Sequence, residues 1–199
     1  MHRPKVPTLL SAFITLLNDR LGETIVFPLL PFLLGRFTNS GSTLGLLAGT
    51  YAISQFAVAP LIGALSDRFG RKPVIITCVS GSVIGLSMFA ITVSTDWNNF
   101  LPTWATSIPL LLLFLARIVD GMSGGTAATA TAVLADISTP ENRSKTFGLI
   151  GVAFGLGFVL GPGLGTALAK FSVTLPVWTA TLFAISNLAL VIWVLPETL

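Results

Sequence analysis

The chain has 199 residues, of which 53% are hydrophobic and only 10% are charged, and its mean hydropathy is +0.87. Soluble domains have about a quarter charged residues, and disordered chains are poor in hydrophobic ones, so both classes are excluded. The net charge of +3 is spread over short loops and gives no basic face for nucleic acid. The composition therefore predicts an all-α integral membrane protein embedded in the lipid bilayer.

Apolar runs long enough to cross a bilayer occur six times along the chain. A transmembrane helix needs about 20 apolar residues, and the runs cover residues 8–35, 43–66, 73–95, 107–134, 146–169 and 174–195. Together they predict one six-helix bundle over residues 1–199, with no room for a soluble domain. The first run is too long for the core of a cleavable signal peptide, so we interpret it as an uncleaved span.

Basic residues are concentrated on one side of this predicted bundle. Seven of the eleven Lys and Arg residues lie in the N-terminal tail and in the loops after the second and fourth spans. Cytoplasmic loops of membrane proteins carry such an excess of Lys and Arg. The pattern predicts a multi-pass protein with both termini in the cytoplasm.

Five ionisable residues lie inside two of the spans: Asp19, Arg20 and Glu23 in the first, and Arg117 and Asp120 in the fourth. Charged side chains are costly in a bilayer, so they usually face a cavity and pair with one another. On a helix Asp19 and Glu23 share a face, and spacings of three predict pairs between Arg20 and Glu23 and between the two residues of the fourth span. Two carboxylates on one face do not both ionise cheaply, so one of them is expected to hold a transferable proton. Two interpretations remain open, namely a proton-carrying site or ion pairs that only make insertion tolerable.

Glycines recur along the fifth predicted span. Gly157, Gly161 and Gly165 follow one another at spacings of four, which predicts a smooth stripe where another helix approaches closely. Pro162 removes a backbone donor and predicts a kink near the outer end of this span.

The fourth span contains a pattern that also occurs in serine hydrolases. Residues 121–125 read Gly-Met-Ser-Gly-Gly and match Gly-x-Ser-x-Gly. A serine nucleophile needs a base, usually histidine, and the only histidine of the sequence is His2, in the tail. We therefore interpret these small residues as a packing face and predict no enzyme. The sequence also has one cysteine, Cys78, and dispersed carboxylates, so it offers no metal-ligand spacing and no cofactor is expected.

Residues 63–73, between the second and third spans, read Gly-Ala-Leu-Ser-Asp-Arg-Phe-Gly-Arg-Lys-Pro. This string resembles the signature loop of the major facilitator superfamily. The arginine-centred run 117–124 is similar to the family's fourth-helix motif, and residues 157–165 are similar to its fifth-helix antiporter motif. The matching positions are Gly63, Asp67, Arg68, Gly70 and Arg71 in the loop, and Gly157, Gly161, Pro162 and Gly165 in the fifth span.

Within that superfamily the chain most resembles the drug:proton antiporters, and among them the tetracycline exporters. Asp19 stands nine residues before Pro28, which is similar to an acidic residue of the exporters' first helix, and Tyr51 and Gln55 match a Tyr-x-x-x-Gln pattern of their second helix. Gly85 is a departure, because the exporters have an acidic residue where we align it.

The resemblance implies a fold of six transmembrane helices arranged as two inverted three-helix repeats, the N-terminal half of a twelve-helix transporter. The C-terminal six-helix half is absent from the sequence, and it would belong to the same longer protein or to a second chain. The implied function is alternating-access transport in a bacterial inner membrane, in which a hydrophobic or amphipathic small molecule is exported in exchange for protons. The alternative is an incomplete half that inserts into the membrane without transporting.

The resemblance also implies roles for particular residues. Asp19, Glu23 and Arg117 would couple transport to protons, and Tyr51, Gln55 and Asp120 would line the substrate cavity. The loop that carries Asp67 and Arg71 would gate the cytoplasmic side.

Overall fold

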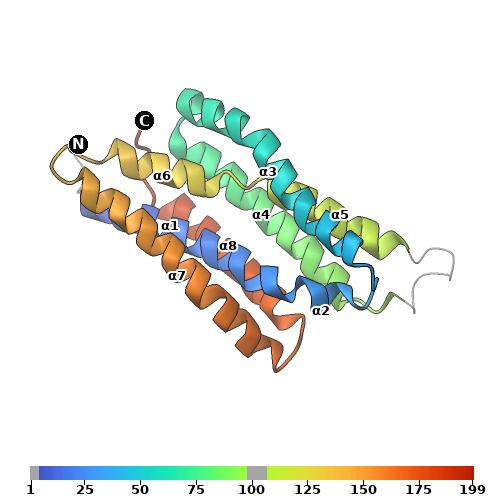
Figure 1. Cartoon of the computed structure of the whole chain (residues 1–199). Helices are drawn as coiled ribbons and strands as arrows, with labels where there is room; N and C mark the ends of the chain where they lie inside the picture. The colour runs from blue at the N-terminus through green and yellow to red at the C-terminus, as the bar shows by residue number, and fades with distance from the viewer. Residues whose placement is uncertain (1–4, 98–106) are drawn as a thin grey trace.

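The computed structural model describes residues 5–97 and 107–199, and all regular elements of these residues are helices (Figure 1). His2, Arg3 and most of the loop after the third predicted span lie outside the described residues. The elements are α1 (Lys5–Val26), η1 (Phe27–Leu29), α2 (Leu30–Leu34), α3 (Gly41–Phe69), α4 (Arg71–Ser94), α5 (Ser107–Met122), α6 (Thr126–Asp136), α7 (Arg143–Ala169) and α8 (Leu175–Trp193).

Local sequence sets several of the helix ends. Pro28 and Pro31 fall at the starts of η1 and α2, where a missing N–H costs least, and they divide the first predicted span into three pieces. Ser40 caps α3, because its Oγ accepts the Thr43 N–H at 3.4 Å. Gly70, with φ of 99°, ends α3 and starts α4 at once, a conformation that glycine adopts without strain.

Five helices of the described residues are long and apolar enough to cross a membrane: α3, α4, the combined segment Ser107–Asp136, α7 and α8. Their bounds agree with five of the six apolar runs in the sequence to within a few residues. The helix α1 is not among the five, and it carries Asp19, Arg20 and Glu23. The first predicted span, 8–35, and the two-repeat arrangement therefore stay predictions.

The fourth predicted span, 107–134, is not one continuous helix. Residues 123–125 form a turn between α5 and α6. Gly124 and Gly125 weaken the helix here, since glycine gains no side-chain packing and loses much backbone freedom in a helix. The break lies two turns beyond Arg117, directly after the residues that build the site.

The helices pack around α1, which contacts α6, α7 and α8, while α4 joins α5 to α8 and α3 packs on α5. Figure 1 shows α3 and α7 at opposite edges of the bundle. These two helices are also the least buried of the five, with 11% and 17% of their most apolar segments buried.

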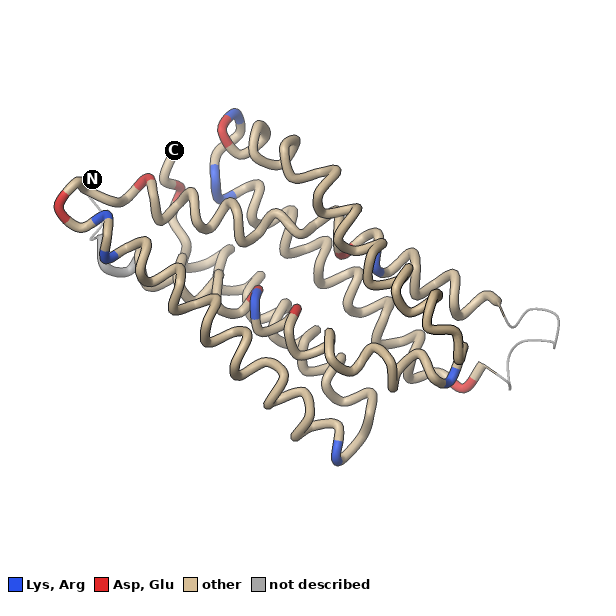
Figure 2. Tube along the Cα trace, viewed as in Figure 1, with Lys and Arg blue, Asp and Glu red and all other residues tan. Residues whose placement is uncertain are grey.

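Two separate apolar clusters form the core. Along α1, Ala12 and Leu16 belong to one cluster and Ile25 and Val26 to the other. The same division occurs along α4 and α8 and between α5 and α6. The charged residues of α1 and α5 occupy the level between the two clusters, and Figure 2 shows charged positions inside the bundle as well as at its two ends. The fold therefore places a polar layer at mid-bundle.

Candidate functional site

The charged residues of α1 form a connected group. The Arg20 guanidinium contacts Asp19 Oδ2 through Nη2 at 2.7 Å and Glu23 Oε2 through Nη1 at 2.5 Å. It also lies over the Phe154 ring of α7, 5.1 Å from the centroid. The predicted pair between Arg20 and Glu23 is confirmed. The contact with Asp19 joins neighbours in sequence, which helical spacing does not indicate.

The second charged group lies on α5. Arg117 Nη1 is 3.4 Å from Asp120 Oδ2, so the predicted pair forms, but with a long contact. The Nε and Nη2 atoms of Arg117 are buried without a hydrogen-bond partner. The guanidinium packs instead over Phe89, 4.4 Å from the ring centroid, and lies 5.9 Å from that of Tyr51. These rings stabilise the charge, although they replace few of the hydrogen bonds it makes in water.

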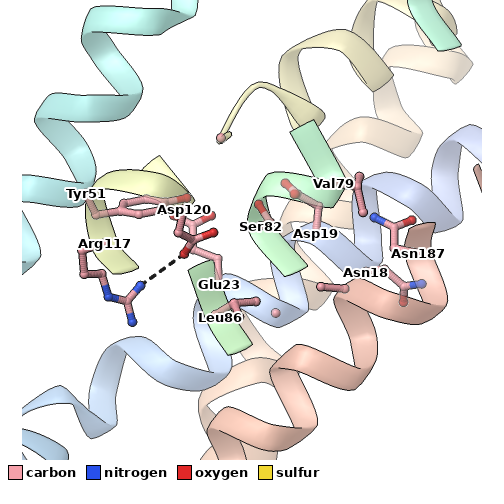
Figure 3. A pocket seen from close by; sticks show the side chains of 13 residues that line it. Asn18, Asp19, Glu23, Tyr51, Val79, Ser82, Leu86, Arg117, Asp120 and Asn187 are labelled. Carbon is pink, nitrogen blue, oxygen red and sulfur yellow. Dashed lines mark hydrogen bonds and ion pairs between the residues drawn. The ribbon is translucent and has the colours of Figure 1, made fainter. Parts of the chain in front are cut away.

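A small cavity of about 30 Å³ joins the two charged groups. Figure 3 shows its side chains converging from α1, α3, α4, α5 and α8. A second cavity of about 180 Å³ is lined by Glu23, Tyr51, Gln55 and Arg117 with apolar neighbours. The six residues predicted for proton coupling and the substrate cavity therefore line these two cavities. The structure adds Asn18, Ser82 and Asn187, which sequence reasoning missed; their only signal was a polar side chain in an apolar run.

Gln55 connects α3 to the break between α5 and α6. Its Nε2 donates to the Gly124 carbonyl oxygen at 3.0 Å and to the Tyr51 hydroxyl at 3.4 Å. A carbonyl at a helix break lacks an intrahelical donor, so the Gln55 amide satisfies it. A Cβ on Gly124 would collide with this amide. The predicted Tyr-x-x-x-Gln pair therefore lies against the small-residue run of the fourth span.

Gly85 of α4 lies directly against Asp120. A Cβ at Gly85 would lie 2.8 Å from the Cβ and the backbone nitrogen of Asp120. A larger side chain at this position would push α5 away from α4. Glycine at this position thus makes room for Asp120 on the facing helix.

The predicted glycine stripe of α7 packs against α1. A Cβ on Gly157, Gly161 or Gly165 would collide with Arg20, Thr24 or Ile25, whereas Gly148, Gly151, Gly155 and Gly163 of the same helix have nothing within 4 Å. Thr24 Oγ1 bonds across this contact to the Gly157 carbonyl at 2.8 Å. The stripe is confirmed as a close helix contact, and α7 continues unbroken through Pro162.

The serine of the hydrolase-like pattern is a packing residue. Ser123 Oγ donates to the Val119 carbonyl at 2.8 Å, and a Cβ on Gly81 of α4 would collide with this side chain. Gly121 makes the same kind of contact with Tyr51 and Ser54 of α3. The small residues thus allow α3 and α4 to approach the break from two sides.

The loop between α3 and α4 is built around Arg71. Its Nη1 contacts Asp67 Oδ1 at 2.6 Å and donates to Ser66 Oγ at 2.7 Å, and its Nε contacts Asp136 Oδ2 at 2.9 Å. Asp136 ends α6, so the loop is tied to the end of a helix that packs on α4. The Asp67 side chain is 68% exposed.

Two other predicted loop residues have no such role inside the described chain. The Arg68 guanidinium lies over the ring of the neighbouring Phe69, 5.3 Å from the centroid. Gly63 has nothing within 4 Å of the position where a Cβ would stand.

Glu197, which follows α8, caps the start of α4. Its carboxylate accepts the backbone N–H groups of Arg71 at 2.8 Å and Lys72 at 3.0 Å, and also those of Thr198 and Leu199. Partial burial raises the pKa of Glu197, but the four N–H bonds outweigh it and hold the pKa below its usual value. Lys72 Nζ adds a bond of 2.9 Å to the Ile192 carbonyl. Gly70 is required here, because a Cβ would lie 2.6 Å from the carboxylate.

The sequence profile of the Major Facilitator Superfamily matches residues 10–199. The class C tetracycline resistance protein of Escherichia coli is 37% identical over 187 residues, which are 92% of this chain and 43% of that protein. The chain spans less than half the length of the curated relatives it matches.

Solved structures give the same result for the fold. The human organic anion transporter MFSD10 superposes with a TM-score of 0.78 at 31% identity, over 100% of this chain and 49% of that one. A D-xylose-proton symporter superposes with a TM-score of 0.73 over 96% of this chain and 48% of that one. At 19% identity the symporter supports the fold alone. From its sequence, its multi-pass apolar helices and its fold, the chain belongs to the Major Facilitator Superfamily, a family of membrane transporters rather than enzymes.

Proposed function

We propose that the chain forms one half of an alternating-access transporter that moves an amphipathic small molecule in exchange for protons. The observation that carries this proposal is the mid-bundle layer in which Asp19, Glu23 and Asp120 meet two guanidinium groups beside two cavities. Carboxylates at this depth are rare in membrane proteins and mark ion or substrate pathways. Among the relatives are tetracycline resistance proteins and an organic anion transporter, which supports a substrate with both polar and apolar parts.

In this proposal Asp19 and Glu23 take up and release the proton, and Arg117 sets how readily they do so. Tyr51 and Gln55 contact the substrate in the 180 Å³ cavity, where Phe27 and Leu30 supply apolar surface, and Asp120 contacts it from the adjoining small cavity. The α3–α4 loop, with Asp67 and Arg71, closes the cytoplasmic side, and the exposed Asp67 carboxylate is available to another bundle. The helices would follow the two-repeat plan, with α1 and α5 in equivalent positions.

The second half of the transporter would cover the face of α3. This helix exposes Phe56 at 83% and Ile53 at 70%, and Gly63 is open on the same helix. Lipid or another helix bundle covers such an apolar surface, and an exposed glycine allows the close approach of another helix. We propose that a six-helix half, in the same longer protein or in a second chain, packs there. Both termini would lie in the cytoplasm of a bacterial inner membrane.

Flux in membrane vesicles tests the proposal, with tetracycline and the anionic dye fluorescein as probes under an imposed pH gradient. The variant Asp19→Asn should abolish gradient-driven flux while the amount of inserted chain stays unchanged. The control Glu141→Gln removes an exposed acid of the α6–α7 turn and should transport normally. Normal flux in Asp19→Asn would exclude Asp19 from proton coupling.

The alternative is that the chain is an incomplete half that does not transport, and a second assay distinguishes it from the proposed function. The chain is assayed alone and together with a C-terminal six-helix half from a tetracycline resistance relative. Flux that appears only in the second case would show that residues 1–199 insert but do not transport by themselves.

A further inference from the structure

We infer that the break between α5 and α6 is a two-state hinge, which Gln55 of α3 holds open and which a substrate closes when it takes the Gln55 amide. In the open state the two helices are separated by residues 123–125, as the structure shows (Figure 1). In the closed state they form one continuous helix. The inference rests on the proposed function, because Gln55 lines the 180 Å³ cavity, and it deepens that function by naming a positioning residue that connects the cavity to α6.

The break separates backbone groups that a continuous helix would pair. In an α-helix the carbonyl of Gly124 accepts the N–H of Ala128, four residues later. The structure shows no such bond between these two described residues. The first bond of α6 runs instead from the Thr129 N–H to the Gly125 carbonyl, at 3.0 Å. Closing the break would therefore add a helical bond that the open state lacks.

Thr126, the first residue of α6, also lacks a bond that closing would supply. Its hydroxyl is buried without a hydrogen-bond partner, which is costly. Several threonine hydroxyls of the described helices bond to the carbonyl four residues earlier, as do those of Thr24, Thr92 and Thr181 at 2.7, 2.7 and 2.9 Å. For Thr126 that carbonyl belongs to Met122, on the other side of the break. A continuous helix brings the two groups within reach of each other.

Gln55 stabilises the open state because it replaces the missing helical bond. Its Nε2 donates to the Gly124 carbonyl at 3.0 Å and to the Tyr51 hydroxyl at 3.4 Å, and these two bonds use both of its N–H donors. A substrate acceptor beside Tyr51 in the cavity competes for this amide. A carbonyl that loses its donor inside the membrane is strongly unfavourable, and the Ala128 N–H is the donor that helical geometry offers instead. The substrate thus favours the closed state through its contact with Gln55.

The helix α6 connects the hinge to the cytoplasmic loop. It ends at Asp136, whose Oδ2 contacts Arg71 Nε at 2.9 Å, and Arg71 in turn contacts Asp67 at 2.6 Å. A helix is a rigid element, so a new angle between α5 and α6 displaces Asp136 at its far end. Closing the hinge therefore changes the contacts of Arg71 in the α3–α4 loop.

Unfilled volume beside the break leaves room for this movement. An apolar cavity of about 480 Å³ lies between α3, α4 and the break, and Ile62, Cys78, Met122 and Ser123 are among its lining residues. Close-packed interiors resist such changes, because any shift meets another side chain. The turn at residues 123–125 borders a cavity on this side, so it can shift without displacing the packed core.

Amide hydrogen exchange of the purified 199-residue chain tests the hinge at the Ala128 N–H, which is bonded within the helix only in the closed state. Gln55→Met keeps the length of the side chain and removes its donors, so it should slow exchange at Ala128 by roughly tenfold or more. A merely structural contact predicts the opposite, because its loss would loosen the break and speed this exchange. The matched control Thr50→Val removes a hydroxyl that bonds within α3 and should leave Ala128 unchanged.

A second variant keeps the test decisive if Gln55→Met does not fold. The Cβ of Gly124→Ala would lie 2.3 Å from Gln55 Nε2, so it displaces the amide, and alanine favours the helix. Exchange at Ala128 should slow here as well. The inference is overturned if exchange at Ala128 is unchanged or faster in Gln55→Met, or in Gly124→Ala where Gln55→Met does not fold.

The substrate step is tested in the wild type with tetracycline and fluorescein as probes, whose binding is followed by equilibrium dialysis. A probe that binds should slow exchange at Ala128, and Gln55→Met, which is already closed, should show no further change. Binding without an effect at Ala128 would overturn the substrate step. If neither probe binds, the proposed function fails for these probes, while the two variants still decide the hinge because they are measured without substrate or flux.

Discussion

The ionic contacts at the α3–α4 loop and those of Arg117 at mid-bundle differ in how completely their charges are satisfied. At the α3–α4 loop, Arg71 contacts two carboxylates and a serine hydroxyl, and Glu197 accepts four backbone N–H groups. At mid-bundle, Arg117 has one carboxylate contact of 3.4 Å and two nitrogen atoms without partners.

The physical reason is the supply of backbone groups. Helix ends leave free N–H and C=O groups that bond to charged side chains. The loop lies where α4 begins and close to where α6 ends. In mid-helix the backbone groups bond to one another, so a buried charge depends on other side chains. Arg71 is therefore satisfied by contacts among the described residues, whereas Arg117 keeps two nitrogen atoms without a hydrogen-bond partner.

Removal of Arg117 should have the largest effect. The variant Arg117→Leu leaves Asp120 buried without its cation and should cost about 3–5 kcal/mol of stability, measured by thermal unfolding in detergent. The double variant Arg117→Leu with Asp120→Leu should recover most of this loss, because no unpaired charge remains. A double variant as unstable as the single one would mean that Arg117 acts through packing on Phe89 instead.

A methyl group at Gly157 should have the second-largest effect on stability. Its Cβ would lie 2.6 Å from the Cβ of Arg20, so Gly157→Ala forces α7 away from the charged group at a cost of about 1–3 kcal/mol. The control Gly155→Ala points into open space and should be neutral or stabilising by about 0.5–1 kcal/mol, because alanine is the better helix former. Equal melting temperatures for the two variants would show that close packing does not hold Arg20.

The cap at Glu197 predicts a smaller effect that depends on pH. Because the pKa of Glu197 is lowered in the folded state, its contribution is present above the unfolded pKa of about 4.3 and is lost as the pH falls through the folded value. Glu197→Gln should cost about 0.5–2 kcal/mol at pH 7, the usual range for a helix cap. Melting curves of the variant and the wild type should converge as the pH falls, and a difference that does not shrink in acid would contradict the cap.

Asp67 should matter least for stability. Its carboxylate is 68% exposed, and exposed ion pairs contribute about 0–1 kcal/mol. Asp67→Asn should therefore melt almost like the wild type, while flux through a complete transporter should fall if this carboxylate contacts the other half. A large loss of stability would place Asp67 with the structural residues of the loop.

The sequence predicted those features that depend on local pattern. Apolar runs gave five spans close to their observed bounds, and helical spacing gave the pairs of Arg20 with Glu23 and of Arg117 with Asp120. The glycine spacing of α7 correctly indicated a close helix contact.

The features that the sequence did not predict join distant parts of the chain. Asn187 bonds to Thr15 across 172 positions, and Glu197 reaches Arg71 across 126. The break at residues 123–125 has a local signal in Gly124 and Gly125, but its contacts with Gln55 and Ile62 of α3 are equally hidden. Such contacts follow from tertiary packing, which neither periodicity nor spacing encodes.

The position of Glu197 also sets an order of events during biosynthesis. The N-terminus of α4 receives its cap from a residue that the ribosome adds 126 positions later, which takes roughly 6–25 s at about 5–20 residues/s. During that interval the α3–α4 loop has Arg71 and Asp67 but no cap, and water or lipid headgroups must serve its free N–H groups. The loop becomes complete only when α8 has entered the membrane, so α8 completes the structure that α3 and α4 began.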